Sequence, residues 1–322
     1  MKYLLSFTML LFTFGYSQDN RFPTFNKENI FLGIYFLKDN ALSTKQVLQR
    51  DINQLQLAKD PWLTSDDIRF YDYSTHRIYL KKESSRLFNK INIKNHLFDG
   101  NLIDKPFIVV ANQKKCYVGS FERPLFQSFP SCPFIVVGTG NRKDVIQISY
   151  ARIIDKNDMR NDSCVKDALT SLGLYHGGIS VELISVSVDD NSDTSTVEYD
   201  FTIRNLDQDN LYVIDPNKVG TEFFHYYTNG IVFSNGKGRP IESKYKKVKS
   251  SNHDQITNWL TEIKVNTSIE RKIKLKGYPK IPKDSYECHF IYHNPDIEDQ
   301  YLFDGRVWLG SVISSVINVD VK

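Results

Sequence analysis

The sequence predicts an α+β domain over residues 27–174, followed by an all-β sandwich domain over residues 179–322. Three observations predict this division. Before residue 174, apolar runs of strand length alternate with segments of helical period. His176-Gly177-Gly178 has the composition of a linker. After Ile179, most segments alternate apolar and polar residues and end in turn residues, as strands of a sandwich do.

The first 17 residues predict a secretory signal peptide. An apolar run from Tyr3 to Phe14 follows Lys2, and Gly15-Tyr16-Ser17 has the small-x-small pattern of a cleavage site. About a dozen apolar residues are fewer than the roughly 20 that a spanning helix needs. We therefore expect an exported protein, periplasmic or extracellular, without a transmembrane segment.

The elements of the first half follow from local pattern. Residues 29–37, NIFLGIYFL, predict a buried strand. A loose apolar period over residues 41–57 predicts a helix capped by Ser43 or Thr44. Thr64, spaced three residues before an acidic side chain, predicts a short capped helix over residues 63–72.

Residues 71–82, YDYSTHRIYLKK, place a carboxylate at Asp72 close to an imidazole at His76. The two side chains would face each other only if a helix continued through residues 73–75, which are poor helix formers. Asp72, Ser and Thr side chains instead favour a turn before a strand that begins near Ile78. A turn is the prediction, and a catalytic pair is the alternative.

The remaining elements are predicted in the same way. We expect an amphipathic segment over 83–98, strands at 106–111, 115–121, 133–138 and 144–153, and a helix over 161–174 stopped by Gly173. Beyond the linker, strands are expected at 181–188, 195–205, 257–266, 270–277, 284–294 and 304–321. Asn229-Gly230 in TEFFHYYTNGIVFS predicts a hairpin.

Asp284, Tyr286 and Cys288 form a D-x-Y-x-C string that resembles the start of strand F in immunoglobulin domains. The resemblance covers about 140 residues and implies an immunoglobulin-like sandwich with a tyrosine corner. It differs in one respect: since no other cysteine follows residue 164, the usual inter-sheet disulfide cannot form. Cys288 is therefore expected to be a buried thiol.

In the first half, the strings PWLTSDDI, THRIYL and KPFIVVANQKKCYVGSF are similar to an uncharacterised module of bacterial exported and lipid-anchored proteins. They are also similar to the periplasmic domain of the SecD export subunit. This resemblance implies a fold and no activity, and it transfers no catalytic residue.

The net charge and the cysteine pattern indicate which partners, disulfides and metal sites to expect. With 41 basic and 38 acidic residues, the net charge of +3 creates no strong field for nucleic acid. Export permits disulfides, and a bridge between Cys116 and Cys132 would close a loop of roughly 15 residues. Cys164 is expected to be a buried thiol. Cysteine and histidine spacing fits no zinc site.

Motifs for catalysis, cofactors or metals are lacking, and the loop at Asp189 departs from a calcium-binding loop at its sixth and twelfth positions. We predict no catalytic residue, no metal and no cofactor. Residues 117–129 concentrate aromatic side chains with arginine, a composition enriched at binding hot spots. The candidate binding residues are Tyr117, Phe121, Glu122, Arg123 and Phe126. The alternative is that these rings cover the domain's own sheet.

The favoured function is a non-catalytic exported binding module with a protein or cell-envelope partner. One alternative is a hydrolase with a site in the interdomain cleft, built from Asp72, His76 and Arg123. The other is a secreted protease inhibitor, because immunoglobulin-like domains can present a loop to a protease. The sequence does not indicate the oligomeric state.

Overall fold

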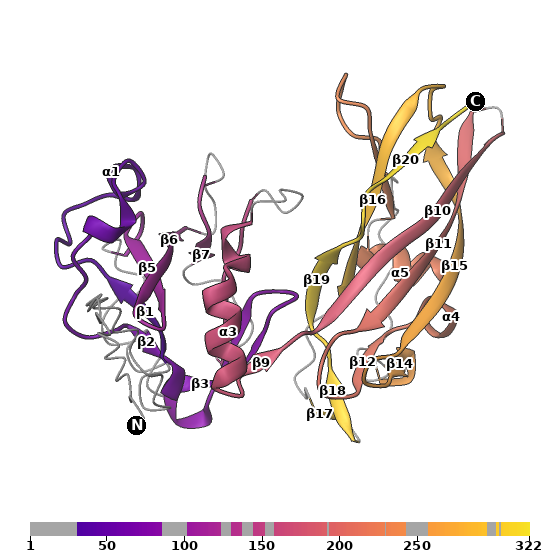
Figure 1. Ribbon diagram of the computed structural model, residues 1–322. Coiled ribbons are helices and arrows are strands. Elements are labelled where there is room, and N and C mark those ends of the chain that lie inside the picture. The colour runs from indigo at the N-terminus through magenta and orange to yellow at the C-terminus, as the bar shows by residue number, and fades with distance from the viewer. Residues whose placement is uncertain are drawn as a thin grey trace, which may run out of the picture.

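The computed structural model describes residues 31–85, 102–123, 130–136, 144–151, 158–191, 193–228, 230–242, 257–294, 301–302 and 304–322. The predicted signal peptide lies outside these residues. Strands dominate the described chain, and its buried apolar residues form separate clusters, one drawn from 179–321 and two from 32–169. We call residues 31–176 the N-terminal part and residues 179–322 the C-terminal part. They lie side by side, joined through β9 (Tyr175–His176) (Figure 1).

Two sheets form the N-terminal part. The first has the order β2-β1-β5-β6-β7, which are Leu63–Thr64, Leu32–Phe36, Pro106–Ala111, Lys114–Glu122 and Phe134–Val136. The second has the order β8-β4-β3-β9, in which β8 is Val145–Gln147, β4 is Arg77–Leu80 and β3 is Ile68–Asp72. Helix α3 (Ser163–Ser171) is capped by Asp162. Gly173, which was predicted to stop this helix, follows it at φ +68°.

The core of the N-terminal part follows from the alternation of its strands. One cluster joins residues of both sheets to the apolar face of α3, including Ile34, Tyr71 and Leu169. On the other face of the first sheet, Ile108 and Val118 pack beneath the segment that carries α1 (Thr44–Val47) and η2 (Ile52–Gln54). The first sheet is therefore covered on both faces, as its nearly continuous apolar strands require.

Two predicted helices in this part are shorter than expected. The helix over 41–57 is divided into α1 and η2, because Asp51 turns the chain and caps η2 with a hydrogen bond from Asn53 N. The predicted capping box of Thr64 and Asp67 is present but closes only one 3-10 turn, η3 (Ser65–Asp67), before β3 begins. Most of the amphipathic segment 83–98 lies outside the described residues.

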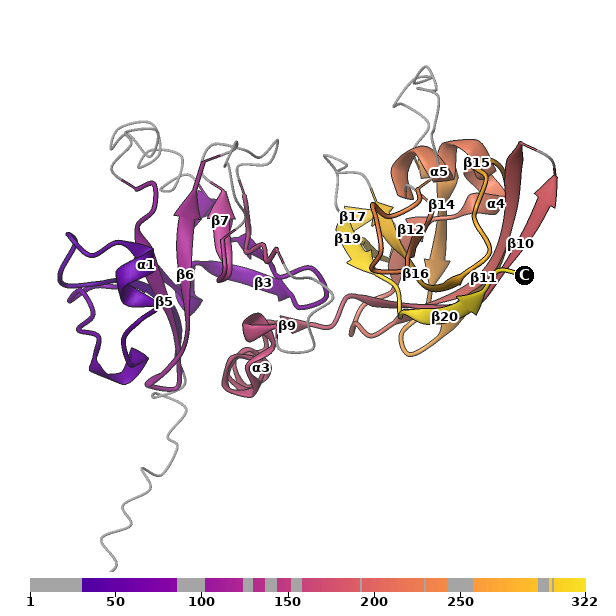
Figure 2. The same ribbon diagram turned by 90° about the horizontal axis from the view of Figure 1, so that it is seen from above.

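The C-terminal part consists of β layers around the largest core cluster. One sheet has the order β10-β11-β15, which are Ile179–Asn191, Thr194–Asn205 and Ser268–Pro279. A second has the order β14-β12-β18-β17, which are Leu260–Ile263, Leu211–Ile214, Gly305–Val307 and Tyr301–Leu302. A third contains β13 (Ile231–Ser234), β16 (Ser285–Asn294), β19 (Gly310–Ile313) and β20 (Ile317–Asp320). Figure 2 shows these layers from above.

The hairpin predicted at Asn229-Gly230 is wrong. After the short helix α4 (Pro216–Val219), residues Thr221–Thr228 form helix α5 where the hairpin needs a strand, and β13 begins at Ile231. Phe224 and Thr228, one turn apart on α5, are fully buried, and the Thr228 hydroxyl donates to the carbonyl of Phe224. Burial of this helical face against the core prevails over the local turn preference.

Candidate functional site

The predicted turn after β3 is confirmed. Asp72 Oδ1 accepts hydrogen bonds from Ser74 Oγ at 2.7 Å, Thr75 N at 3.2 Å and Thr75 Oγ1 at 3.1 Å. His76 closes the turn at φ +52°, and its Nδ1 lies 3.0 Å from the hydroxyl of Tyr71. Burial lowers the pKa of His76 from 6.5 to about 3. Asp72 and His76 thus serve separate structural contacts.

The free oxygen of Asp72 binds an arginine from the C-terminal part. Arg306, in β18, is fully buried, and its Nη2 donates to Asp72 Oδ2 at 2.8 Å and to Asp207 Oδ2. Its guanidinium carbon lies 5.1 Å from the centre of the Phe70 ring. Two residues on, Trp308 Nε1 donates to Ser74 Oγ at 3.0 Å. One cation therefore bridges a carboxylate from each part.

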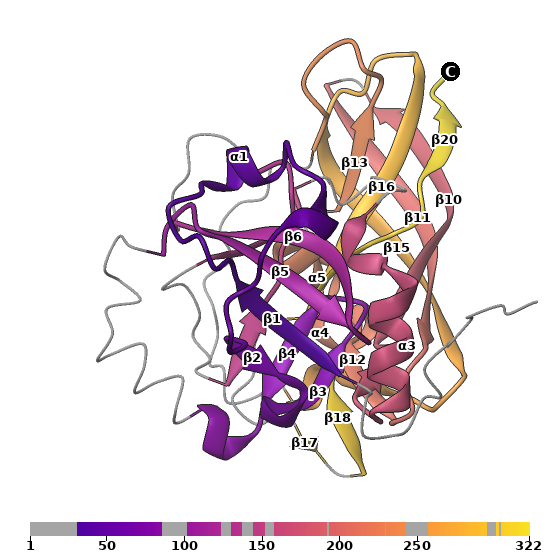
Figure 3. The ribbon, with the colours of Figure 1, turned by 60° about the vertical axis from the view of Figure 1, so that its left-hand side comes forward.

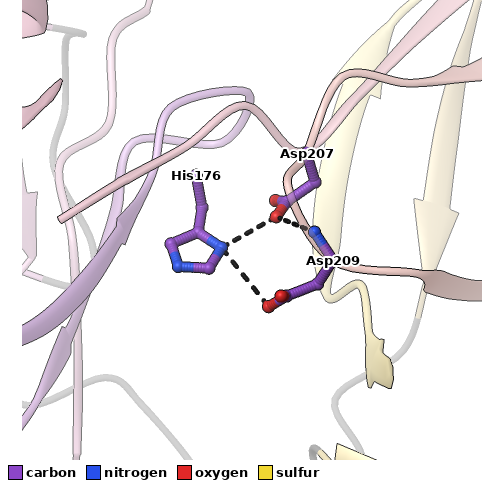
Figure 4. A group of neighbouring side chains, drawn as sticks. All are labelled: His176, Asp207 and Asp209. Atoms are coloured by element: carbon purple, nitrogen blue, oxygen red, sulfur yellow. Dashed lines mark hydrogen bonds and ion pairs between the residues drawn. The ribbon is translucent and has the colours of Figure 1, made fainter. Parts of the chain in front are cut away.

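Asp207 connects this bridge to the linker. Its Oδ1 lies 2.8 Å from His176 Nδ1 (Figure 4). Its Oδ2 accepts from Gly178 N at 3.0 Å. Since a carboxylate only accepts, His176 Nδ1 carries the proton and Nε2 can accept from Gln208 Nε2 at 3.1 Å. Burial alone would raise the pKa of Asp207, but hydrogen bonds from His176 and Arg306 and the charge of Arg306 hold it well below its ordinary value.

The linker is part of this network rather than a free tether. β9 pairs in parallel with β3, bringing His176 opposite Asp72. Gly178 has φ +66°, and a Cβ placed there would lie 2.1 Å from Ser74 Oγ. A side chain at Gly177 would meet the carbonyl oxygen of Leu206 at 2.1 Å. Both glycines are therefore required because the linker packs closely against the N-terminal part at Gly178 and against the C-terminal part at Gly177. We call the set His176, Asp72, Asp207 and Arg306 the Arg306 joint.

His176, Asp207 and Asp209 bring one nitrogen and two carboxylates within 4.8 Å of one another, a spacing that could hold a metal ion. A metal ion would need lone pairs of Asp207, but both carboxylate oxygens already accept two hydrogen bonds each. Oδ1 accepts from His176 and from Asp209 N, and Oδ2 accepts from Gly178 N and Arg306. A divalent cation would also face the guanidinium of Arg306 across the same carboxylate. This geometry favours a hydrogen-bonded joint over a metal centre.

A groove lies in the N-terminal part, at the edge of the first sheet. It has a volume of 450 Å³, and we call it the β6 groove. Its floor is Cys116, Tyr117 and Val118 of β6, and its walls are Leu48 and Ile52 on one side and Asp158, Met159 and Asp162 on the other. The latter wall is formed by η4 (Met159–Asn161) and the residues on either side of it. Leu48 and Met159 are 38% and 43% exposed. Figure 3 shows β6 and α1 from the side of the N-terminal part.

The predicted binding residues do not form one exposed surface loop. Tyr117 and Phe121 are only 3% and 1% exposed and belong to the core between the two sheets. Both side chains lie on the face of β6 that packs toward the second sheet and α3, so they point into this core. Glu122 is half-buried and accepts from Ser120 Oγ at 2.7 Å, and Arg123 is exposed. Phe126 lies outside the described residues, and Tyr117 alone of the set lines the β6 groove.

The predicted bridge between Cys116 and Cys132 is not formed, and all four cysteines are free. Cys132 Sγ lies 3.7 Å from Ser120 Oγ. Ser120 is four residues beyond Cys116 on the same strand, about 13 Å away at the usual rise per residue. A disulfide requires Cα atoms within about 7 Å. Cys288 is fully buried, as predicted, and Cys164 is only half-buried at the start of α3.

Sequence reasoning missed Asp207 and Arg306 and treated His176 only as a linker residue. The available signal was weak. Arg306 is a single cation before the apolar run Val307 to Leu309, a pattern that can mark a buried, paired charge. Its partners lie 99 and 234 residues away in the chain, so no local spacing could reveal them.

Comparison of the sequence with models of protein families and with curated proteins finds no match. Within the described residues, none of the helices combines the length and apolarity that crossing a membrane requires.

Proposed function

We propose that this chain is a non-catalytic exported binding protein that engages a protein or another component of the cell envelope through the β6 groove. The observation that carries the proposal is the groove itself. A hollow of 450 Å³ is within the range of ligand sites in proteins. Its rim exposes two large apolar side chains, Leu48 and Met159, which lose contact with water when a partner covers them.

The non-catalytic assignment is supported by the way the titratable groups are used. The hydrolase alternative requires Asp72 and His76 to act on a substrate together with Arg123. Asp72 is fully buried and bound by the turn and by Arg306, and His76 is buried against Tyr71. A base with a pKa of about 3 is a poor proton acceptor near neutral pH.

The immunoglobulin-like assignment of the C-terminal part belongs to the same proposal. Its β layers share one apolar core, and the Tyr286 hydroxyl donates to the carbonyl of Pro282 at 3.0 Å. A tyrosine corner makes a backward hydrogen bond of this kind. In this role the sandwich, together with the Arg306 joint, holds the N-terminal part in one orientation.

The test is co-sedimentation of the purified chain with isolated cell envelopes. Leu48→Glu combined with Met159→Glu places two charges on the groove rim and should weaken retention about tenfold or more, since a loss of roughly 1.4 kcal/mol suffices for this. Ile184→Glu, at a 51% exposed position on β10, is the matched control and should bind like the wild type. Equal retention of both variants, with unchanged circular dichroism, would remove the β6 groove from the function.

A further inference from the structure

In the part of the chain that the structure describes, one edge of β6 pairs with another strand along only part of its length. β5 pairs with β6 through Lys114 to Ser120 on one side. On the other side β7 pairs only with Ser120 to Glu122. Among the described residues, no strand therefore pairs with residues 115–119 on the β7 side. An open strand edge presents backbone donors and acceptors to any extended chain that reaches it.

The direction of these backbone groups follows from their neighbours. Ser120 N donates toward β7, to the carbonyl of Pro133 at 2.9 Å, whereas Phe121 N donates to Lys105 O on the β5 side. Successive residues of a strand direct their backbone groups to alternate edges. The N–H and C=O of Val118, two residues before Ser120, therefore point to the open edge.

The β6 groove lies over this edge. Tyr117 and Val118 are neighbours in β6, and their side chains pack into different clusters on opposite faces of the sheet. Both residues line the groove, so it extends across the rim of the sheet from one face to the other. A chain lying in it can bond to the backbone of β6 and place its side chains alternately on the two walls.

The charges that line the groove are acidic. Asp158 and Asp162 are its charged lining residues. Asp158 is bound at both oxygens by Arg160. Asp162 caps α3 through Oδ1, while Oδ2 is 3.8 Å from the exposed Lys114 Nζ, a loose ion pair. Asp162 Oδ2 can therefore accept from a basic side chain of a ligand.

We propose that the β6 groove binds an extended peptide that adds to β6 as a further strand, in line with β7. An apolar side chain of the peptide lies between Leu48 and Met159, and a basic side chain reaches Asp162. This inference rests on the proposed function and defines its ligand class. At about 3.3 Å per residue, the open stretch accommodates roughly four or five peptide residues.

The experiment is a bead-bound library of random hexapeptides, screened with the full-length chain and with the variant that carries Leu48→Glu and Met159→Glu. Peptides retained only by the wild type should combine apolar and basic residues. Each selected peptide is then resynthesised in two forms. In one form the backbone nitrogens of the odd-numbered residues carry methyl groups, and in the other form those of the even-numbered residues do. In one of the two forms the methyl groups remove the N–H donors that face β6, and this form should bind at least tenfold more weakly. In the other form the methyl groups face away from β6, and binding should be unchanged.

Asp162→Asn completes the experiment, because asparagine also caps helices and the start of α3 is kept. It should weaken selected peptides that carry a basic residue and leave their neutral analogues unaffected. Equal tolerance of both methylated sets, or no peptide that distinguishes the wild type from the rim variant, overturns the strand-addition proposal. If strand addition is overturned but retention on cell envelopes still depends on Leu48 and Met159, the proposed function remains supported. If retention on cell envelopes does not depend on these two residues, the proposed function itself is contradicted.

Discussion

Replacing Arg306 with methionine removes the only cation that the structure places between Asp72 and Asp207 among the described residues. Arg306 and the two carboxylates are all buried, with side-chain exposure of 0% for each. Breaking a buried ion pair on one side costs about 3–5 kcal/mol, because a charge is left without compensation. Asp72 keeps its turn donors, and Asp207 keeps His176 and Gly178 N. We therefore expect a loss near the lower end of that range, about 3 kcal/mol.

The assay is urea denaturation followed by circular dichroism and tryptophan fluorescence. The matched control is Lys272→Met, which removes an exposed ion pair with Glu198. That control should leave the urea midpoint close to the wild-type value, since exposed pairs contribute little. Asp72→Asn added to Arg306→Met should recover part of the loss, because an amide needs no counter-charge. If Arg306→Met is as mild as the Lys272→Met control, the buried bridge does not stabilise the fold as argued.

Three further outcomes can be checked by denaturation. Gly178→Ala should destabilise more than Gly236→Ala: both glycines have positive φ, but a Cβ at Gly178 meets Ser74 Oγ at 2.1 Å and one at Gly236 meets nothing within 4 Å. Equal losses would contradict the close packing of the linker. His76 has its pKa lowered from 6.5 to about 3, so the unfolded state takes up a proton first as pH falls. Stability should then decline below pH 6.5 by about 1.4 kcal/mol per pH unit from this group, and His76→Asn should make the slope shallower. An unchanged slope would show that His76 is not buried as a neutral group. Phe121→Ala should lower the free energy of unfolding by about 3–5 kcal/mol, because Phe121 is a core residue. A loss below about 1 kcal/mol would show that its side chain is not buried in the core.

Much of the strand architecture could be predicted because alternation records burial directly. Val197, Tyr199, Phe201 and Ile203 are all fully buried in β11, as their period indicates. Residues 221–228 were misassigned because their aromatic run fits a strand and a buried helix equally well. Periodicity over so few residues does not separate the two.

The candidate sites were less accessible to sequence reasoning. The turn at Asp72 could be predicted from local side-chain chemistry, but its bond to Arg306 depends on a contact across 234 residues. The aromatic composition around Tyr117 drew attention to β6. It could not show which rings face the core, because that depends on strand register. The β6 groove arises where η4 and the α1 segment converge on β6, and no local spacing encodes that meeting.

The central claim is that the Arg306 joint holds the two parts in one orientation. Backbone ¹⁵N relaxation of the intact chain measures rotational diffusion for residues in each part separately. We predict one correlation time shared by residues 32–176 and 179–321 in the wild type, and two different, shorter times after Arg306→Met. Two distinct times in the wild type would contradict the account directly, because parts joined as described must tumble together.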